Sequence, residues 1–323
     1  MRDRPEGVRE NELVAVLLDG WGLDLRSISY FPVGAGSYHW AVTDDTGGAW
    51  FVTVDDLSRE VNAREHAFST LGRAFDTALA LRREAGLEFV VAPVPDDVGS
   101  TVRRLNARYA VSVFPMLDGE AGRFGAHRPQ DRGPVVELLV RLHKATSVVA
   151  AVAVRTDLVL PGRAGLESAL HDLDRVWTGG PFAERVRRLL AARADRVRAM
   201  LADFDRLVAR VRDGGGPWVV THGEPHPGNV MRTAHGLRLI DWDTVRIAPP
   251  ERDLWLLATD DSDSVLADYA KATGRAVDPA GLALYRLWWE LADIAVYVDD
   301  LRQPHRVTED TAASWRYLAG YLE

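Results

Sequence analysis

The sequence contains no cysteine, which excludes disulfide bonds and cysteine-ligated metal sites. It also has no long apolar run: residues 148–154 form an uninterrupted one near mid-chain, too short to cross a bilayer. The first residues, MRDRPEGVRENELV, are charged and lack the apolar core of a signal peptide. These absences predict a cytoplasmic enzyme or binding protein without a membrane partner.

Lysine is almost missing. Of the 39 basic residues only Lys144 and Lys271 are lysine, so none stands before residue 144. The net charge of −8 argues against nucleic acid as a partner, because phosphate contacts need clustered basic residues. Such a charge fits a cationic small molecule, although many cytoplasmic proteins are as acidic.

A length of 323 residues predicts one large domain or two moderate ones. Residues 1–115 read as a mostly antiparallel sheet with one long helix, which Ser58 caps and which ends near residue 85. The predicted strands are 27–33, 39–43, 49–54, 89–92 and 108–114. A glycine-rich loop, Gly34-Ala35-Gly36-Ser37, joins the first two strands, and such a loop can point backbone N–H groups at phosphate oxygens.

Residues 116–323 read as mostly helical, with predicted helices at 134–146, 166–177, 181–212, 264–273, 279–301 and 308–322. The same part of the chain contains two short apolar strands, 218–221 and 237–240. A polar cluster follows the C-terminal end of each strand. The clusters are His222, Glu224, His226 and Asn229, then Asp241 and Asp243.

These polar clusters would form a poor hydrophobic core but a good site for a divalent cation and a phosphate ester. Mg²⁺ prefers oxygen ligands, and Asn229 and Asp241 offer a neutral and an anionic oxygen. Phosphoryl transfer also needs a carboxylate to hold the acceptor hydroxyl, and Glu224 has a suitable spacing from Asn229. A zinc site from His222, Glu224 and His226 is a weaker alternative, since no HExxH helix is present.

The segments HGEPHPGN, IDWD and APPERDLW, in this order and spacing, resemble the aminoglycoside phosphotransferase family, and within it the spectinomycin phosphotransferase-like group. The resemblance covers nearly the whole chain. It implies an α+β, protein-kinase-like two-lobed fold, with a small antiparallel-sheet N-terminal lobe (1–115) that binds nucleotide. The helical C-terminal lobe (116–323) would hold the catalytic loop, the metal site and the substrate site.

The resemblance also implies roles for individual residues. ATP or GTP phosphates would lie under Gly34, Gly36 and Ser37, and the base against the backbone of Phe114, Met116 and Leu117. Mg²⁺ would bind Asn229, Asp241 and Asp243, and Glu224 would be the catalytic base. His222, His226 and Asp253 would support the loop.

The chain departs from the family pattern at two positions. Glu224 stands where aspartate is usual, and the added methylene moves the carboxylate by roughly an ångström. Thr53 stands where the third strand normally carries a phosphate-binding lysine. Arg59, Arg64 and Arg103 are the candidates to take its place, since arginine binds phosphate in a fork. Glu60 or Glu65 would be the helix glutamate that loses the lysine as its partner.

Acidic and aromatic side chains in the C-terminal lobe suit a cationic substrate, although charged runs are often only solvated surface. The candidates are Asp260, Asp261, Trp289, Glu290 and Asp293. The favoured function is an ATP- and Mg²⁺-dependent O-phosphotransferase acting on an aminocyclitol, aminoglycoside or related cationic metabolite, as a monomer or homodimer. A pseudokinase without turnover and a kinase that modifies a peptide natural-product precursor are the alternatives.

Overall fold

The computed structural model describes residues 1–58, 61–258 and 263–323. Helices account for 47% of the chain and strands for 16%. The chain forms two compact units. The first comprises residues 3–156 and 217–277 with Met1, and the second comprises residues 157–216 and 278–323 with Arg2. The lobe boundary predicted after residue 115 stays a prediction.

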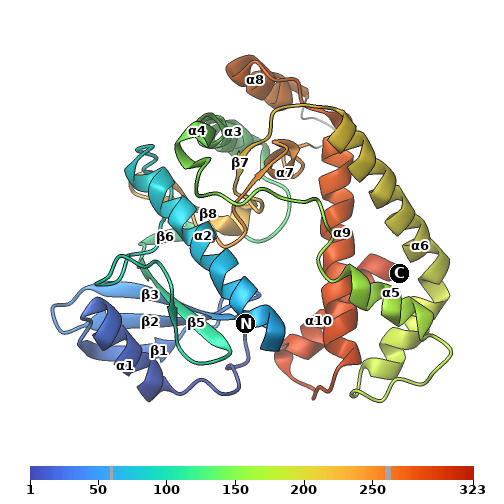
Figure 1. Cartoon of the computed structure of the whole chain (residues 1–323), viewed down its shortest axis with the longest axis horizontal. Helices are drawn as coiled ribbons and strands as arrows, with labels where there is room; N and C mark the ends of the chain where they lie inside the picture. The colour runs from blue at the N-terminus through green and yellow to red at the C-terminus, as the bar shows by residue number, and fades with distance from the viewer. Residues whose placement is uncertain (59–60, 259–262) are drawn as a thin grey trace. The chain divides into compact units, whose positions relative to one another are not determined.

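A five-stranded antiparallel sheet in the order β1-β2-β3-β5-β4 opens the first unit (Figure 1). Its strands are β1 (Leu25–Tyr30), β2 (Tyr38–Asp44), β3 (Ala49–Asp56), β4 (Arg103–Arg104) and β5 (Tyr109–Pro115). In the central register, Thr53 of β3 lies opposite His39 of β2 on one side and Ser112 of β5 on the other. The sheet therefore has β3 at its centre.

Helix α1 (Glu10–Trp21) packs against one face of this sheet. Leu13 and Leu17, four residues apart, project from one side of the helix and are fully buried against Trp40, Val52 and neighbouring valines. The helix stops at Gly22, whose φ of 65° suits a glycine. Val52 and Val54 thus take one face of β3, and Thr53 and Asp55 take the other.

Helix α2 (Arg64–Arg83) packs over the other face, where Phe75 meets Phe114 of β5 at 5.5 Å in an edge-to-face contact. A 3₁₀ turn, Val61–Ala63, precedes the helix, so the predicted cap at Ser58 is wrong. Instead, the Ser58 carbonyl accepts a hydrogen bond from Arg64.

The strand predicted at 89–92 is also wrong. Only an isolated parallel bridge forms between Val90 and Leu239, with backbone hydrogen bonds from Val91 to Leu239 and from Leu239 to Phe89. The chain continues into Pro93 and Pro95, which have no N–H to extend a ladder.

The rest of the first unit places the polar clusters. A three-stranded sheet has the order β6-β8-β9, and β7 pairs with β10. The loop predicted to be catalytic, residues 222–229, runs between β7 and β8 and is called the catalytic loop below. Asp241 follows β9. The elements are β6 (Gly119–Ala121), α3 (Pro129–Lys144), α4 (Thr146–Val149), β7 (Val219–Thr221), η2 (Pro227–Asn229), β8 (Val230–Thr233), β9 (Gly236–Leu239), β10 (Arg246–Ala248), α7 (Glu251–Leu254) and α8 (Asp263–Thr273).

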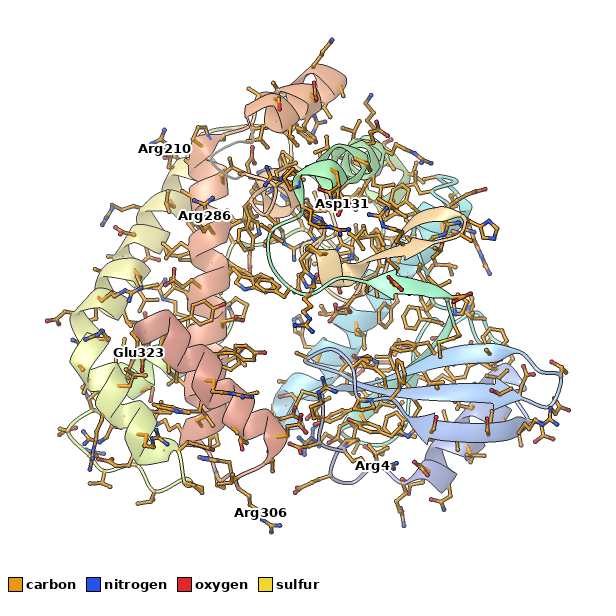
Figure 2. All side chains as sticks on the ribbon, turned by 180° about the vertical axis from the view of Figure 1, so that it is seen from behind. Arg4, Asp131, Arg210, Arg286, Arg306 and Glu323 are labelled. Carbon is orange, nitrogen blue, oxygen red and sulfur yellow. The ribbon has the colours of Figure 1, made fainter. Side chains whose placement is uncertain are left out.

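The second unit consists of four packed helices: α5 (Arg163–His171), α6 (Ala183–Asp213), α9 (Pro279–Arg302) and α10 (Glu309–Leu322). The long α6 buries a stripe at three- and four-residue spacing that includes Val186, Leu190, Ala194 and Val197. Figure 2 labels Arg210 on α6, Arg286 on α9 and Glu323 at the end of α10. The helix predicted at 166–177 ends early, at His171.

In the described ranges, no helix has both the length and the apolarity that a membrane span requires.

Candidate active site

The Asp253 carboxylate holds the catalytic loop from behind. It accepts hydrogen bonds from the backbone N–H of His222 (2.9 Å) and of Gly223 (2.6 Å), and it contacts Nε2 of His143 at 3.0 Å. Burial opposes ionisation of this carboxyl, but the His143 hydrogen bond and nearby positive charge hold its pKa below the ordinary value. The loop therefore starts from a fixed, fully buried anchor.

His143 extends this anchor to α8. Its Nδ1 lies 2.7 Å from the Tyr269 hydroxyl, and both side chains are buried. Sequence reasoning missed these two residues, because they lie on separate helices far from the loop in sequence and carry no motif of their own.

Arg252 and Gly223 fit together at the start of the loop. The Arg252 guanidinium donates to the Thr221 hydroxyl (3.0 Å) and to the Thr244 carbonyl (2.9 Å). Gly223 has a φ of 105°, and a Cβ there would lie 2.3 Å from an Arg252 nitrogen. Only glycine satisfies both the backbone angle and the close approach.

The His222 side chain links the two strand ends. Its Nε2 lies 2.8 Å from the Ile240 carbonyl oxygen, and its Nδ1 accepts from the Glu224 N–H at 3.2 Å. The ring meets the buried Trp242 ring edge-on at 4.7 Å. Burial lowers the pKa of His222 to about 4, so the ring is neutral at pH 7.

The proline-rich part of the loop is held by further local contacts. The His226 ring Nδ1 accepts a hydrogen bond from the Gly228 N–H (3.1 Å), and the His226 backbone N–H donates to the Glu224 carbonyl (2.8 Å). On the far side, Nε2 of His127 lies 2.7 Å from the Pro225 carbonyl. His127 is another residue that sequence reasoning did not single out.

Asn229 closes the loop. Its buried amide nitrogen donates to the Glu224 carbonyl at 3.0 Å. This bond commits the nitrogen and leaves the amide oxygen as the atom able to bind a cation. The Glu224 side chain itself is partly exposed.

Asp241 and Asp243 follow β9. Asp241 has a φ of 68°, a left-handed conformation that an aspartate tolerates better than most residues. Its side chain is accessible to solvent, although protein surrounds it on most sides. Burial, then the Asp243, Glu224 and Asp55 carboxylates, raise its pKa well above the ordinary value. Burial also raises the pKa of Asp243, and the positive charge of Arg246 partly offsets this increase.

The donor set fits Mg²⁺. Asn229 and the two aspartates offer one amide oxygen and two carboxylates that destabilise each other when ionised, and a divalent cation would relieve that repulsion. Within the residues that are described, no group of three or more histidine, aspartate or glutamate side chains is placed to hold a metal ion. A Mg²⁺ ion here would take its remaining ligands from water and phosphate.

The glycine-rich loop has the backbone its sequence predicts. Gly34 and Gly36 have φ angles of 67° and 91°. The Ser37 hydroxyl donates to the Asp55 carboxylate on β3 at 2.6 Å. The amino group of Met1 donates to the carbonyls of Val33 (3.0 Å) and Gly34 (2.9 Å).

The segment predicted to contact the base runs from the end of β5. Phe114 is buried, whereas Met116 and Leu117 are half-buried. The Met116 N–H donates to the Ala49 carbonyl at 3.2 Å, and Pro115 has no N–H. Neither Pro115 nor Met116 therefore offers a free backbone N–H to a base, and Leu117 remains the candidate donor.

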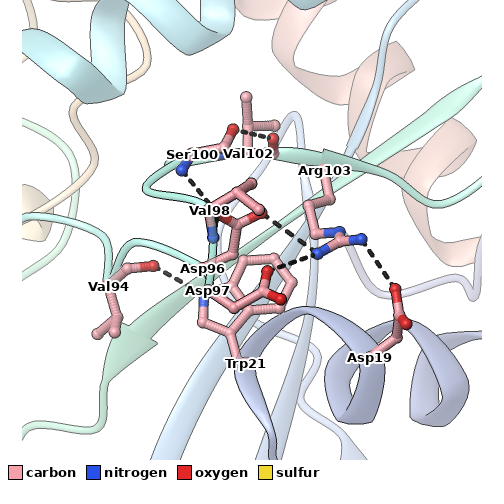
Figure 3. A network of polar contacts seen from close by, with 9 residues as sticks. All are labelled: Asp19, Trp21, Val94, Asp96, Asp97, Val98, Ser100, Val102 and Arg103. Carbon is pink, nitrogen blue, oxygen red and sulfur yellow. Dashed lines mark hydrogen bonds and ion pairs between the residues drawn. The ribbon is translucent and has the colours of Figure 1, made fainter.

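Arg103 does not take the place of the lysine. Its guanidinium donates to Asp19 of α1 (2.8 Å), Asp97 (3.3 Å) and Asp96 (3.4 Å), as Figure 3 shows. The same loop is pinned by the Trp21 indole, which donates to the Val94 carbonyl. This network fixes the loop after Pro95 to α1.

The other candidate partners are similarly accounted for. Arg64 donates to the Ser58 carbonyl, and Glu65 forms an ion pair with Arg104 of β4. Arg59 and Glu60 lie outside the described residues.

Two of the predicted substrate residues, Asp260 and Asp261, also lie outside the described residues. The other three are on α9, in the second unit. Glu290 pairs with Arg196 of α6 at 3.3 Å, and Asp293 accepts a hydrogen bond from the Tyr321 hydroxyl at 2.7 Å. Burial raises the pKa of Asp293, which Tyr321 and Trp289 partly counteract.

Solved structures show which fold this is. Spectinomycin phosphotransferase in complex with ADP and spectinomycin matches with a TM-score of 0.73 at 15% identity, covering 98% of this chain and 95% of that one. Choline kinase LicA from Streptococcus pneumoniae matches with a TM-score of 0.56 at 13% identity, covering 97% and 98%. The predicted α+β, protein-kinase-like fold is confirmed.

Sequence comparison identifies the family. Protein StrN of Streptomyces griseus is 28% identical over 309 residues, which cover 93% of this chain and 87% of StrN. The model of the phosphotransferase enzyme family matches residues 27–288, which include the glycine-rich loop and the whole catalytic loop. This chain therefore belongs to the phosphotransferase enzyme family, and the predicted enzyme class is confirmed.

Proposed function

We propose that this protein transfers the γ-phosphoryl group of ATP or GTP, with Mg²⁺, to a hydroxyl group of a small cationic molecule. The observation that carries the proposal is the placement of Glu224, Asn229 and Asp241 on one tightly bonded loop and the adjoining strand end. The amide oxygen and carboxylates would hold Mg²⁺, which when bound neutralises phosphate charge.

The residues of the loop suit in-line transfer. The acceptor oxygen would form its bond to the γ-phosphorus while the bond to the β–γ bridging oxygen breaks and the nucleoside diphosphate leaves. Glu224 would take the hydroxyl proton. Its backbone is fixed by His222 and Asn229, so the position of its carboxylate depends on the side chain alone.

A cationic acceptor is supported by the second unit. Asp293 lies close to Tyr321, Trp289 and Tyr297. Burial raises the pKa of Asp293 against hydrogen bonds from Tyr321 and Trp289, which lower it, and burial and the charge of Asp293 raise the pKa of Tyr297. A partly buried carboxylate among aromatic rings suits an ammonium group, because the carboxylate attracts it by charge and the rings attract it by cation–π contact. The names of the structural neighbours, a spectinomycin phosphotransferase and a choline kinase, agree with this class of acceptor.

The test is γ-phosphoryl transfer by the purified protein with Mg²⁺ and either nucleotide, across a panel of hydroxylated amines that includes aminocyclitols, aminoglycosides and amino alcohols. Glu224→Gln should lower turnover by about 10²- to 10⁴-fold, because general-base catalysis contributes on this scale. Glu224→Asp should retain activity. Two results together would overturn the proposal: no transfer to any acceptor, and no measurable difference between the wild type and Asp241→Asn.

One observation favours the second candidate, a pseudokinase that binds without turnover. The residue in the lysine position is Thr53, and its hydroxyl oxygen lies 3.3 Å from Nδ1 of His39 on the neighbouring strand, within hydrogen-bond distance. Nucleotide binding measured by calorimetry, combined with the transfer assay, separates the two functions: the pseudokinase would show no turnover with any acceptor.

A further inference from the structure

The face of β3 that should carry a phosphate-binding cation carries an acid instead. Thr53 stands in the lysine position, and Asp55 lies two residues further along on the same face. The Ser37 hydroxyl, at the end of the glycine-rich loop, donates to Oδ1 of Asp55 at 2.6 Å. Asp55 is thus attached directly to the loop predicted to cover the nucleotide phosphates.

The second carboxylate oxygen of Asp55 lacks a partner. The residue is only 9% exposed, and its Oδ2 is buried without a hydrogen bond among the residues that the structure describes. A buried, unpaired carboxylate is costly, so an atom of this kind marks a position that a ligand completes.

Asp55 also interacts with the metal-binding end of β9. Burial and the Asp243 carboxylate raise its pKa to about 7, against the opposing Ser37 hydrogen bond. Asp55 in turn contributes to the raised pKa of Asp241. The three carboxylates therefore act on one another, and phosphates could approach them only with additional positive charge.

Among the described residues, the arginines predicted as substitutes for the lysine do not supply this charge. Arg103 is held by three aspartates, and Arg64 donates to the Ser58 carbonyl. The Met1 amino group donates to carbonyls of the glycine-rich loop.

We propose that Asp55 binds a divalent cation of its own, which contacts the nucleotide phosphates in place of the missing lysine. This inference rests on the proposed function, since the phosphates supply the other ligands. Mg²⁺ in proteins is commonly held by one or two carboxylates together with substrate phosphates rather than by a cage of side chains. Asp55 Oδ2 and phosphate oxygens form such a set, separate from the ion at Asn229 and Asp241.

The test counts bound Mn²⁺ by electron paramagnetic resonance, on the whole protein saturated with a non-hydrolysable ATP analogue. Asp55→Asn should bind one ion fewer than the wild type, and its analogue affinity at millimolar Mn²⁺ should fall by about ten- to hundredfold. Asp56→Asn is the matched control. It removes the next carboxylate on the strand, which pairs with Arg108, and should leave the ion count unchanged.

Asp55→Lys supplies the cation directly. It should also bind one ion fewer but keep analogue affinity within a fewfold of the wild type, which a purely structural role of Asp55 does not predict. Equal ion counts in the wild type and both Asp55 variants would overturn the inference while leaving the proposed function intact. A wild type that binds no analogue would overturn the proposed function as well, and unfolding of both variants without nucleotide would show that Asp55 is structural.

Discussion

The two sides of the catalytic loop differ in how their carboxylates are satisfied. Behind the loop, Asp253 has hydrogen-bond donors from the backbone and a contact to His143, and its pKa is lowered. In front, Asp241, Asp243 and Asp55 act on one another, and their pKa values are raised. The back is complete as a protein structure, whereas the front would be completed by the cations that we propose. Substitutions behind the loop should therefore cost stability, and substitutions in front should cost activity.

The largest effect should come from Asp253→Ala. It leaves the N–H groups of His222 and Gly223 and the side chain of His143 without their acceptor in a fully buried position. Loss of one partner of a buried charged network costs about 3–5 kcal/mol. Urea unfolding measures this loss. Asp45→Ala, at an exposed turn, should stay within about 0.5 kcal/mol of the wild type, and an equal loss in both variants would contradict the comparison.

Asp241→Asn should have the opposite profile. Phosphoryl transfer should fall by about 10²- to 10³-fold or more, the scale of losing one preorganised electrostatic contact. The ligand-free protein should unfold at the same temperature or higher, because the substitution removes repulsion from Asp243 and Asp55. Paired transfer assays and thermal unfolding check this. A variant that loses stability along with activity would show that the front is structural too.

His143→Gln sharpens the comparison on the back side. Glutamine has a polar group near the position of Nε2 but none near the position of Nδ1. It therefore cannot contact both Asp253 and Tyr269, and one buried group loses its partner, at about 1–3 kcal/mol. Chemical denaturation measures the change. His235→Gln, at an exposed turn, is the control and should be neutral. If His143→Gln is as stable as its control, the contact from α3 to Asp253 contributes nothing.

A further prediction concerns acid stability. Burial lowers the pKa values of His39, His222 and His226 to about 4 each. Between pH 6.5 and 4 these three histidines bind protons in the unfolded chain that they do not bind in the folded one, so the stability that they contribute is lost as pH falls. The raised pKa values of Asp55, Asp241 and Asp243 act in the opposite direction. For the fully buried His222 the slope is about 1.4 kcal/mol per pH unit.

Thermal midpoints from pH 4 to 7 measure the acid effect. His39→Gln should reduce the slope by its share without affecting the catalytic loop. An equal pH dependence of stability in the wild type and His39→Gln would show that the His39 ring is not held neutral.

The sequence was sufficient for the parts of the site that are local in the chain. The strand ends, the glycine-rich loop and the spacing of Glu224, Asn229 and Asp241 follow from short patterns. It did not reveal His143 or Tyr269, because their contacts join helices more than 100 residues apart, with a separation of 126 between the two. It did not reveal Asp55 either, because the absence of lysine at Thr53 suggested an arginine as the replacement rather than a second carboxylate.

The elements that were predicted wrongly have similar physical reasons. The segment 89–92 has the apolar composition of a strand, but the prolines that follow it restrict pairing to one bridge. The α2 helix begins after a 3₁₀ turn without a side-chain cap, which its composition does not show. Local pattern thus predicted most elements, and the exceptions depend on the neighbouring residues or on long-range contacts.

Thermal unfolding of the wild type and of Asp241→Asn with ATP, with Mg²⁺, and with both tests the central claim most directly. The wild type should be stabilised strongly only when Mg²⁺ and ATP are present together, because a ligand stabilises the state that binds it, and a metal chelator should remove the effect. Asp241→Asn should show little or none of it. A wild type that millimolar Mg²⁺ and ATP do not stabilise, or that ATP stabilises equally with chelator present, would contradict the account.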